Sequence, residues 1–532
     1  RGSRPAWGRE PFLISPSTGF LMVRINRRQA LACGAFGSPL IGAHAEEASD
    51  EPDAELSDIV RAALKSWDVP GVAVGIVRKG QVTYLAGHGV KKRGDTEPVT
   101  PDTLFGIASC TKAFTTTAMA MLVAQGRMNW DAPVRQYLDY FRLADPSADR
   151  LVTLRDLVCH RSGLGSHDLL WYRASWSPRE AVRRIAHLAP DLQFRSSFQY
   201  QSTMVAAAGY ALEAALGKDA TWEGFVRRRI LEPLQMNRTF CTAAEARKSA
   251  AADLAMPHRR DRTGAIRPVA WYETEWADPA GSIVSCARDL CKWAAFHLRR
   301  GKVVRDGREV ALVPEQALDE THAPQNIIPL HGIDRKLQPL TDHMTYCMGW
   351  VRQDYRGQLL LSHGGTIDGF RTHLTLVPKE QLGIVLLNNL NGTDMNLALS
   401  NTLVDYHLKS PRRDWNAELG EVARERDDAV KWQREEREKR RIPGAKQSRE
   451  DAAYVGTYVE PVFGEAKVKL EDGKLFWEWS TFKCPLEHYH FDTFVAKNEI
   501  INDPFVNFSL GLDGSVVTLH AVNRYFLRAP GK

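Results

Sequence analysis

Two residues with complementary chemistry, Ser109 and Lys112, stand three positions apart in the chain. They open a helical pattern that continues through Met119 and Leu122 and ends at Gly126, a residue suited to a helix C-cap. Because residues i and i+3 share a helix face, the hydroxyl and the amine can meet. Serine is a weak nucleophile near neutral pH, and a lysine can activate it once burial or nearby positive potential favours the free amine. The spacing therefore indicates nucleophilic catalysis by Ser109 with Lys112 as its base.

Tyr200 and the run His363-Gly364-Gly365 add to this pair. A Ser-x-x-Lys match alone is weak, since roughly one or two occur by chance in a chain of this length. A tyrosine before a helix is most often a packing residue, and a His-Gly-Gly run after a strand is most often a turn. Together with a helix N-terminus that can stabilise an oxyanion, however, these residues fill every role that acyl transfer requires.

This set of residues resembles the serine β-lactamase and penicillin-binding-protein family, in the branch of class C-like esterases, DD-peptidases and related peptidases. The resemblance covers about Leu56 to Leu408. Further phrases resemble signatures of this branch: Leu154 to Leu164, which also reads as a helix ending in a glycine stop, Glu232 to Met236, Pro279 to Ser285 and Tyr346 to Trp350. The resemblance implies that Ser109 is the nucleophile, that Lys112 is its base and that Tyr200 passes a proton to the leaving group.

The substrate-binding positions depart from the family pattern. Ser202 stands where the family's Tyr-x-Asn motif has asparagine, so an amide that holds substrate is lost. His363-Gly364-Gly365 replaces Lys-Thr-Gly, and a histidine is mostly uncharged at neutral pH, which weakens its hold on a substrate carboxylate. The glycines allow a substrate backbone to lie along the strand edge. By resemblance, the Ser109 and Thr366 backbone N–H groups form the oxyanion hole. We therefore expect slow β-lactam turnover.

The resemblance implies an enzyme, a serine hydrolase that cleaves peptide or amide bonds through an acyl-enzyme, without metal or organic cofactor. Linearised cyclic peptides such as linear microcystin are the specific substrate hypothesis. A carboxylesterase or a β-lactamase of the same family is an alternative, as is a non-catalytic sensor that binds peptidoglycan fragments. A metalloprotease is not indicated, because the chain has no His-Glu-x-x-His motif. The expected partner is a small peptide or ester, and the oligomeric state stays open.

Composition excludes several other classes of protein. The 532 residues are 44% hydrophobic, and the net charge of +6 arises from interleaved acids and bases, which gives no support to nucleic-acid binding. No stretch of 18 apolar residues occurs, so no transmembrane helix is expected. The eight cysteines form no Cys-x-x-Cys pair, so neither a zinc ribbon nor a thioredoxin-like site is indicated.

The elements that must position the site come from both ends of the hydrolase region. Apolar runs at Val72 to Val77 and Gln81 to Gly87 predict a hairpin before Ser109. Strand patterns return at Leu359 to His363, Thr372 to Val377 and Gly383 to Asn388, after a mostly helical middle. The pattern predicts an α+β fold in which one sheet uses both early and late strands and carries an inserted helical lobe, with the site in a cleft between them.

The remaining segments suggest an exported protein with an appended domain. Asn26-Arg27-Arg28 resembles a twin-arginine signal, and Ala43-His44-Ala45 resembles its cleavage site, which predicts delivery to the periplasm. We expect residues 1–45 to comprise an upstream extension and this signal, with Met22 as the natural start. The serine hydrolase domain is expected at 46–410 and a charged linker or helix at 411–450. Short strands with Asp-Gly turns predict a small β-barrel at 451–532.

Overall fold

The computed structural model describes residues 53–249, 253–272 and 277–530, so the predicted signal at 1–45 lies outside the described residues. The hydrolase region contains an antiparallel sheet of eight strands in the order β2-β1-β14-β13-β12-β11-β10-β9. Its strands are β1 (Gly71–Arg78), β2 (Gln81–Gly89), β9 (Asn326–Ile327), β10 (Met344–Tyr346), β11 (Val351–Tyr355), β12 (Gln358–Ile367), β13 (Phe370–Val377) and β14 (Leu382–Asn388). Val72 of β1 pairs with Asn388 of β14. The early hairpin and the late strands therefore form one sheet, as predicted.

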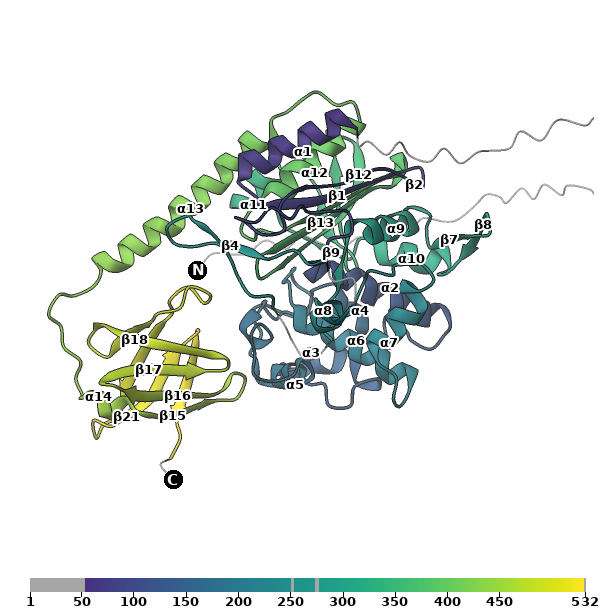
Figure 1. The fold of residues 1–532 in the computed structure, drawn as a ribbon. Coiled ribbons are helices and arrows are strands. Elements are labelled where there is room, and N and C mark those ends of the chain that lie inside the picture. The colour runs from purple at the N-terminus through teal and green to yellow at the C-terminus, as the bar shows by residue number, and fades with distance from the viewer. Residues whose placement is uncertain (1–52, 250–252, 273–276, 531–532) are drawn as a thin grey trace, which may run out of the picture. The chain divides into compact units, whose positions relative to one another are not determined.

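Helices cover both faces of this sheet (Figure 1). One face packs against α1 (Ala54–Trp67) and α12 (Met395–His407), whose apolar side chains join those of β1 and β14 in a buried cluster. Asp53 caps α1, because its carboxylate accepts hydrogen bonds from the backbone N–H groups of Glu55 and Leu56. The other face packs against α9 (Ala287–Leu298). Central strands covered on both faces become near-continuous apolar runs, and every residue of β14 is buried.

The inserted lobe is helical. Its helices are α2 (Thr111–Ala124), α3 (Pro146–Leu151), α4 (Leu154–Val158), α5 (Pro178–Arg184), α6 (Ser202–Leu216), α7 (Trp222–Val226) and α8 (Ala243–Lys248). Short 3₁₀ turns are η1 (Ala108–Cys110), η2 (Val134–Gln136), η3 (Asp168–Leu170) and η4 (Ile185–His187), and η5 (Arg227–Leu231) is a π-helical segment after α7. A further 3₁₀ turn, η6 (Pro378–Glu380), lies between β13 and β14 of the sheet. The other short elements are α10 (Glu315–His322), α11 (Gly332–Leu337), β3 (Phe105–Gly106), β4 (His258–Arg260), β5 (Ile266–Pro268), β6 (Val284–Ser285), β7 (Lys302–Arg305) and β8 (Arg308–Ala311).

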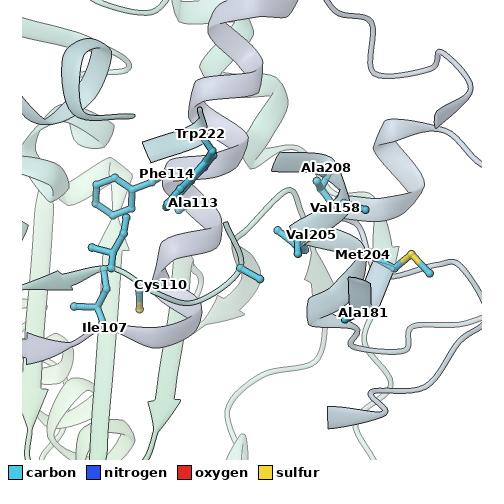
Figure 2. Close-up of a cluster of buried hydrophobic side chains, with 14 of the residues drawn as sticks. Ile107, Cys110, Ala113, Phe114, Val158, Ala181, Met204, Val205, Ala208 and Trp222 are labelled. Atoms are coloured by element: carbon cyan, nitrogen blue, oxygen red, sulfur yellow. The ribbon is translucent and has the colours of Figure 1, made fainter. Parts of the chain in front are cut away.

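Two buried helices form the centre of this lobe. All residues of α2 from Thr111 to Leu122 are buried, and α6 is buried from Ser202 to Leu212. Figure 2 shows Ala113 and Phe114 of α2, beside Trp222, and Met204, Val205 and Ala208 of α6. Since both helices are buried around nearly their whole circumference, they are enclosed by other elements and closely packed.

One predicted helix is shorter than expected. The sequence pattern places a helix from Leu154 to Leu164, but α4 ends at Val158. Thr153 and Asp156 form a capping box at its start, which fixes where it begins. His160 then adopts a φ of 57°, in the left-handed region, and the helix cannot continue through it. This turn directs the His160 ring towards the site described below.

The C-terminal part of the chain is a closed barrel. After helix α13 (Trp415–Lys439) and the short α14 (Asp451–Tyr454), eight antiparallel strands follow in sequence order: β15 (Gly456–Glu460), β16 (Gly464–Glu471), β17 (Lys474–Trp479), β18 (Phe482–His490), β19 (Thr493–Ala496), β20 (Phe505–Leu510), β21 (Val516–Ala521) and β22 (Arg524–Arg528). β15 pairs with both β16 and β22, which closes the barrel. Trp477 and Trp479 lie in its core. These observations confirm the predicted fold class.

Three general properties of the described residues bear on function. No helix in this part of the chain combines the length and apolar character needed to cross a membrane. All seven cysteines within it are buried free thiols. Nor do these residues include any group of three His, Cys, Asp or Glu side chains placed to hold a metal ion.

Candidate active site

Lys112 lies at the centre of the polar contacts at the start of α2. Its Nζ donates hydrogen bonds to Ser109 Oγ at 3.0 Å, to Ser202 Oγ at 3.3 Å and to the Ala280 carbonyl oxygen at 2.8 Å. The side chain is buried, and an ammonium has three N–H donors, so these oxygens account for all of them. The 3.0 Å separation also allows the amine, when neutral, to accept the hydroxyl proton of Ser109. Three residues predicted from sequence therefore lie in one cluster.

The backbone before α2 fixes the direction of Ser109. Ala108 has a φ of 46°, a left-handed conformation that is uncommon for a residue with a Cβ atom. Ile107 donates its N–H to the Ile283 carbonyl at 2.9 Å, and the Ile283 N–H donates to Thr111 Oγ1 at 3.1 Å. These hydrogen bonds hold the turn on both sides of Ser109. Surrounding structure thus maintains a strained backbone at the nucleophile, as is common in active sites.

The segment that carries the Ala280 carbonyl is attached to the same helix. Thr115 Oγ1 donates to the Pro279 carbonyl at 2.6 Å and accepts a hydrogen bond from Trp222 Nε1 at 2.9 Å. Thr115 and Trp222 are both buried. Because Pro279 directly precedes Ala280, these contacts set the position of the carbonyl that receives the Lys112 hydrogen bond. The sequence phrase beginning at Pro279 therefore has a direct structural role at the site.

Tyr200 presents its ring to the lysine. Lys112 Nζ lies 4.9 Å from the ring centroid, within the range of a cation–π contact. The loop before α6 carries this tyrosine, and Gln201 caps the helix by accepting a hydrogen bond from the Thr203 N–H. Among the described residues, no hydrogen bond occupies the Tyr200 hydroxyl. The geometry places the phenol next to the predicted base, where its role as proton carrier stays a prediction.

His160, which the sequence analysis did not single out, packs beside Tyr200. The ring centroids of His160 and Tyr200 lie 4.3 Å apart, and those of His160 and Tyr346 lie 4.4 Å apart. The Gln201 N–H donates to His160 Nδ1 at 3.2 Å, so the ring proton resides on Nε2. Burial, with lesser effects of Lys112 and His363, lowers the pKa of His160 well below its usual value. The neutral His160 ring therefore packs against Tyr200 and supports it. In the sequence, the only signal for His160 is its position just after a short helix.

The structure places His363 differently from the prediction that it binds substrate directly. Its Nδ1 donates to the Gly364 carbonyl at 2.7 Å, and its Nε2 accepts a hydrogen bond from the Tyr346 hydroxyl at 3.0 Å. Burial, aided by the Lys112 charge, lowers the pKa of His363 to about 3. The ring is thus neutral, as the sequence suggested, but both nitrogens already have protein partners. In this arrangement it supports Tyr346 and is not among the residues that line the cavity at Ser109.

The two glycines after His363 have different surroundings. A Cβ atom on Gly365 would lie 2.1 Å from the Ile107 carbonyl oxygen, so the strand can approach the nucleophile turn only because this residue has no side chain. A Cβ atom on Gly364 would meet nothing closer than 3.8 Å. β12 pairs with β13 as far as Ile367, but with β11 only as far as Ser362. Its end beyond Ser362 therefore has one unpaired edge, on which an extended substrate could lie.

A cavity of about 60 Å³ opens beside Ser109. Of the residues predicted from sequence, Ser109, Ser202 and Thr366 line it, whereas Tyr200, His363, Gly364 and Gly365 do not. Aromatic side chains form much of its wall: Trp171, Trp271, Tyr272 and Phe370. The segment after Pro279 forms another wall, and Asp278 contributes a carboxyl group. The geometry thus joins a serine hydroxyl, a buried lysine and an enclosed, largely apolar space.

The sequence analysis missed the aromatic wall and Asp278. Trp171, Trp271 and Tyr272 lie in loops of the stretch that was interpreted as mostly helical. Phe370 lies shortly after Thr366 in the chain, and Asp278 directly precedes the phrase that starts at Pro279. For Phe370 and Asp278, closeness in the sequence to recognised motifs could have indicated a place at the site. Nothing local in the sequence indicates that the other aromatic residues converge on Ser109.

Comparison with known proteins agrees with this geometry. The family model described as Beta-lactamase matches residues 56–409, and a second model, described as Domain of unknown function (DUF3471), matches residues 440–527. The unguisins hydrolase ungD' of Aspergillus campestris is 29% identical over 407 residues, which cover 73% of this chain and 72% of that protein. The unguisins hydrolase ungD of Aspergillus violaceofuscus is 26% identical over 495 residues, covering 87% and 86%.

A solved structure shows the same fold across both parts of the chain. The octameric penicillin-binding protein homologue from Pyrococcus abyssi superposes with a TM-score of 0.58 at 21% identity, covering 89% of this chain and 99% of that one. The Beta-lactamase model alone spans well over half of the sequence and includes the Ser109, Lys112 and Tyr200 motifs. The chain therefore belongs to the β-lactamase family and is a serine hydrolase.

Proposed function

We propose that this protein hydrolyses peptide or amide bonds through an acyl-enzyme formed on Ser109. The observation that carries the proposal is the 3.0 Å contact between Lys112 Nζ and Ser109 Oγ at a cavity next to Thr366. Two relatives, both named as hydrolases of unguisins, support hydrolysis. They give no support to linear microcystin, the specific substrate hypothesis from sequence.

The reaction begins when Lys112, as the free amine, takes the hydroxyl proton of Ser109. The Ser109 oxygen then attacks the substrate carbonyl carbon, and the Ser109 and Thr366 N–H groups stabilise the oxyanion. Tyr200 donates its hydroxyl proton to the departing nitrogen as the C–N bond breaks, which leaves an ester on Ser109. The proton held by Lys112 restores the phenol. A water molecule then attacks the ester, releases the acid and returns the proton to Ser109.

The test uses a fluorophosphonate probe, which reacts with activated serines, together with peptide para-nitroanilides. We expect stoichiometric labelling of the wild-type protein at Ser109 and hydrolysis of at least one anilide. Ser109→Ala should abolish labelling and lower kcat by at least ~10³-fold while the protein stays folded. Ser196→Ala is the matched control, because this exposed serine only bonds the Gln193 carbonyl. Near-normal turnover by folded Ser109→Ala protein would refute the mechanism.

Two related substrate classes are compared in the same assays. An ester of the same acyl group would be cleaved faster than the anilide by any acyl-enzyme mechanism of this kind, because its leaving group needs less help from Tyr200. A chromogenic cephalosporin should be turned over slowly, since Ser202 supplies no amide and His363 is committed to Tyr346 and Gly364. Rapid cephalosporin turnover without anilide or ester cleavage would identify a β-lactamase instead.

We also propose that the protein is exported to the periplasm. The proposal rests on the sequence alone, on Arg27-Arg28 and on Ala43-His44-Ala45. Replacing both arginines by lysine should retain the protein in the cytoplasm, as measured by cell fractionation. Unchanged delivery of this variant would contradict a twin-arginine route.

A further inference from the structure

Asp278 is the only charged side chain among the described residues that line the cavity beside Ser109. Apart from small residues and hydroxyls, its neighbours there are apolar or aromatic. A carboxylate in such surroundings normally has a cationic partner, since burying an unpaired charge is costly. Within the described part of the chain, Asp278 forms no ion pair. The group is therefore available to a ligand in the cavity.

The backbone around Asp278 holds the carboxyl in place. The Ala280 N–H donates to Asp278 Oδ1 at 2.7 Å, and the Asp278 N–H donates to Ser282 Oγ at 2.8 Å. The Gly281 N–H donates to the Asp278 carbonyl oxygen at 3.0 Å. An ionised carboxylate offers about four acceptor positions, and the Ala280 amide is the one donor that the described residues supply. The orientation of the Asp278 carboxyl group is thus fixed, but most of its hydrogen-bond acceptor positions have no donor among the described residues.

The same peptide unit connects Asp278 to the predicted base. The Ala280 N–H faces Asp278, and the Ala280 carbonyl accepts the hydrogen bond from Lys112. Burial raises the pKa of Asp278, opposed by the Ala280 hydrogen bond and by the Lys112 charge. A cation that enters the cavity would favour the ionised carboxylate and form the missing ion pair. It would do so close to the carbonyl that orients Lys112.

We infer that Asp278 binds the free amino terminus of the substrate, so that the enzyme removes the first residue of a peptide. This inference rests on the proposed function and names its substrate class. An α-ammonium lies two bonds from the carbonyl carbon that Ser109 attacks, so both groups fit one small site.

The aromatic wall fits this assignment. Trp171, Trp271, Tyr272 and Phe370 line the same cavity as Asp278, and an ion pair is stronger beside such low-dielectric walls than in bulk water. Their ring faces also attract an ammonium group. An acetylated amino terminus carries no charge and is bulkier. It can therefore form neither the ion pair with Asp278 nor a cation–π contact with the aromatic side chains. Preference for the free amine over the acetylated amine is thus the measurable signature.

The experiment compares alanine para-nitroanilide with its N-acetyl derivative, using both the L- and the D-enantiomer of alanine. The full-length protein, Asp278→Asn and the matched control Asp261→Asn are assayed together. The asparagine introduced by Asp278→Asn keeps an oxygen for the Ala280 N–H but cannot pair with an ammonium. We expect wild-type kcat/KM to favour the free amine by at least about tenfold. Asp278→Asn should lose about 30-fold on the free amine, a typical cost of removing one partner of a buried charge pair, and little on the acetylated substrate.

Fluorophosphonate labelling separates the two possible failures. If Ser109 is labelled but the wild-type enzyme cleaves both substrates equally, cleaves only the acetylated one or cleaves neither, the assignment of Asp278 is overturned and the serine chemistry stands. Equal losses on both substrates in Asp278→Asn, with labelling slowed to match, would show a purely structural role and also overturn it. If Ser109 is not labelled and nothing is cleaved, the proposed function fails and this inference fails with it. Asp261→Asn should match the wild type throughout, because its carboxylate bonds only within the β4–β5 hairpin, to Thr263, Ala265 and Arg267.

Discussion

The nucleophile turn at Ile107 to Lys112 and the strand end at His363 to Thr366 lie against each other, but they use their polar groups differently. Lys112 holds Ser109 and Ser202 at the wall of the cavity. His363 instead directs both ring nitrogens into the protein, towards Gly364 and Tyr346. Both segments carry family motifs, and the sequence analysis expected both to contact substrate. The comparison teaches that a motif can be retained for the shape of a site as well as for its chemistry.

The largest expected effect is a loss of catalytic rate when the base in the nucleophile turn is removed. Lys112→Met should lower kcat by at least ~10³-fold, comparable to the loss in Ser109→Ala, because residues that act as a unit are not additive. The control is Lys218→Met, an exposed lysine outside the site. Steady-state hydrolysis of a reactive anilide or ester measures the effect, and circular dichroism checks folding. Turnover of the Lys112 variant within about tenfold of the wild type would mean that another group is the base.

The second effect tests shape, with adjacent glycines as a matched pair. Gly365→Ala would place a Cβ atom 2.1 Å from the Ile107 carbonyl oxygen, so the strand and the nucleophile turn must separate. We expect a loss of about 1–3 kcal/mol in the free energy of unfolding, together with a fall in kcat. Gly364→Ala, whose nearest contact would be at 3.8 Å, should change stability by less than about 0.5 kcal/mol.

Urea unfolding and kcat measurements on both glycine variants check this prediction. Equal destabilisation by the two substitutions would show that the close approach of β12 to Ile107 is not the deciding contact. A normal kcat in a destabilised Gly365→Ala protein would separate the shape of the strand from the position of Ser109.

The third effect tests whether His363 acts through Tyr346. His363→Ala leaves the buried Tyr346 hydroxyl without its acceptor, which should cost about 1–3 kcal/mol in the free energy of unfolding. Tyr346→Phe in the same background should then cost much less than it does in the wild type, since the hydrogen bond has already been lost. A double-mutant cycle in urea measures this coupling. Strict additivity would contradict the contact, and a change confined to KM would restore direct substrate binding by His363.

The fourth effect is a pH dependence of stability. His363 has a folded-state pKa of about 3, whereas an unfolded histidine titrates near ~6.5. Below that pH the unfolded chain binds the extra proton, so stability falls as the pH drops from about 6.5 towards 3, by at most about 1.4 kcal/mol per pH unit for this group. His363→Gln should make the decline shallower. An unchanged slope in urea titrations between about pH 7 and about pH 4.5 would show that this ring titrates alike in both states.

Much of the fold could be predicted from local sequence patterns. The hairpin around Lys79-Gly80 and the strands near Asn388 follow from apolar runs bounded by turn residues, and α2 follows from helical spacing that ends at Gly126. That early and late strands share one sheet was also expected, because both sets of apolar runs need neighbours, and β1 pairs with β14 in this sheet. The end of α4 was predicted wrongly, since a left-handed φ at His160 depends on its contacts with Tyr200 and Tyr346 and not on local propensity.

Only those residues of the candidate site that belong to recognisable sequence motifs could be predicted. Ser109 and Lys112 follow from helical spacing, and the position of Ser202 follows from its place beside Tyr200. The orientation of His363 could not be predicted, because its two partners are a neighbouring carbonyl and a tyrosine 17 positions earlier in the chain. Asp278 was missed for a similar reason, since its environment depends on aromatic residues that come from separate loops.

The closure of the C-terminal barrel has a consequence for how such a unit can be combined with others. β15 pairs with β22 as well as with β16, so no strand of the barrel has a fully unpaired edge. Exposed edges invite strands of other chains to add, which leads to aggregation. A closed barrel can therefore be attached to a hydrolase through a helix such as α13 without adding a new site for such pairing.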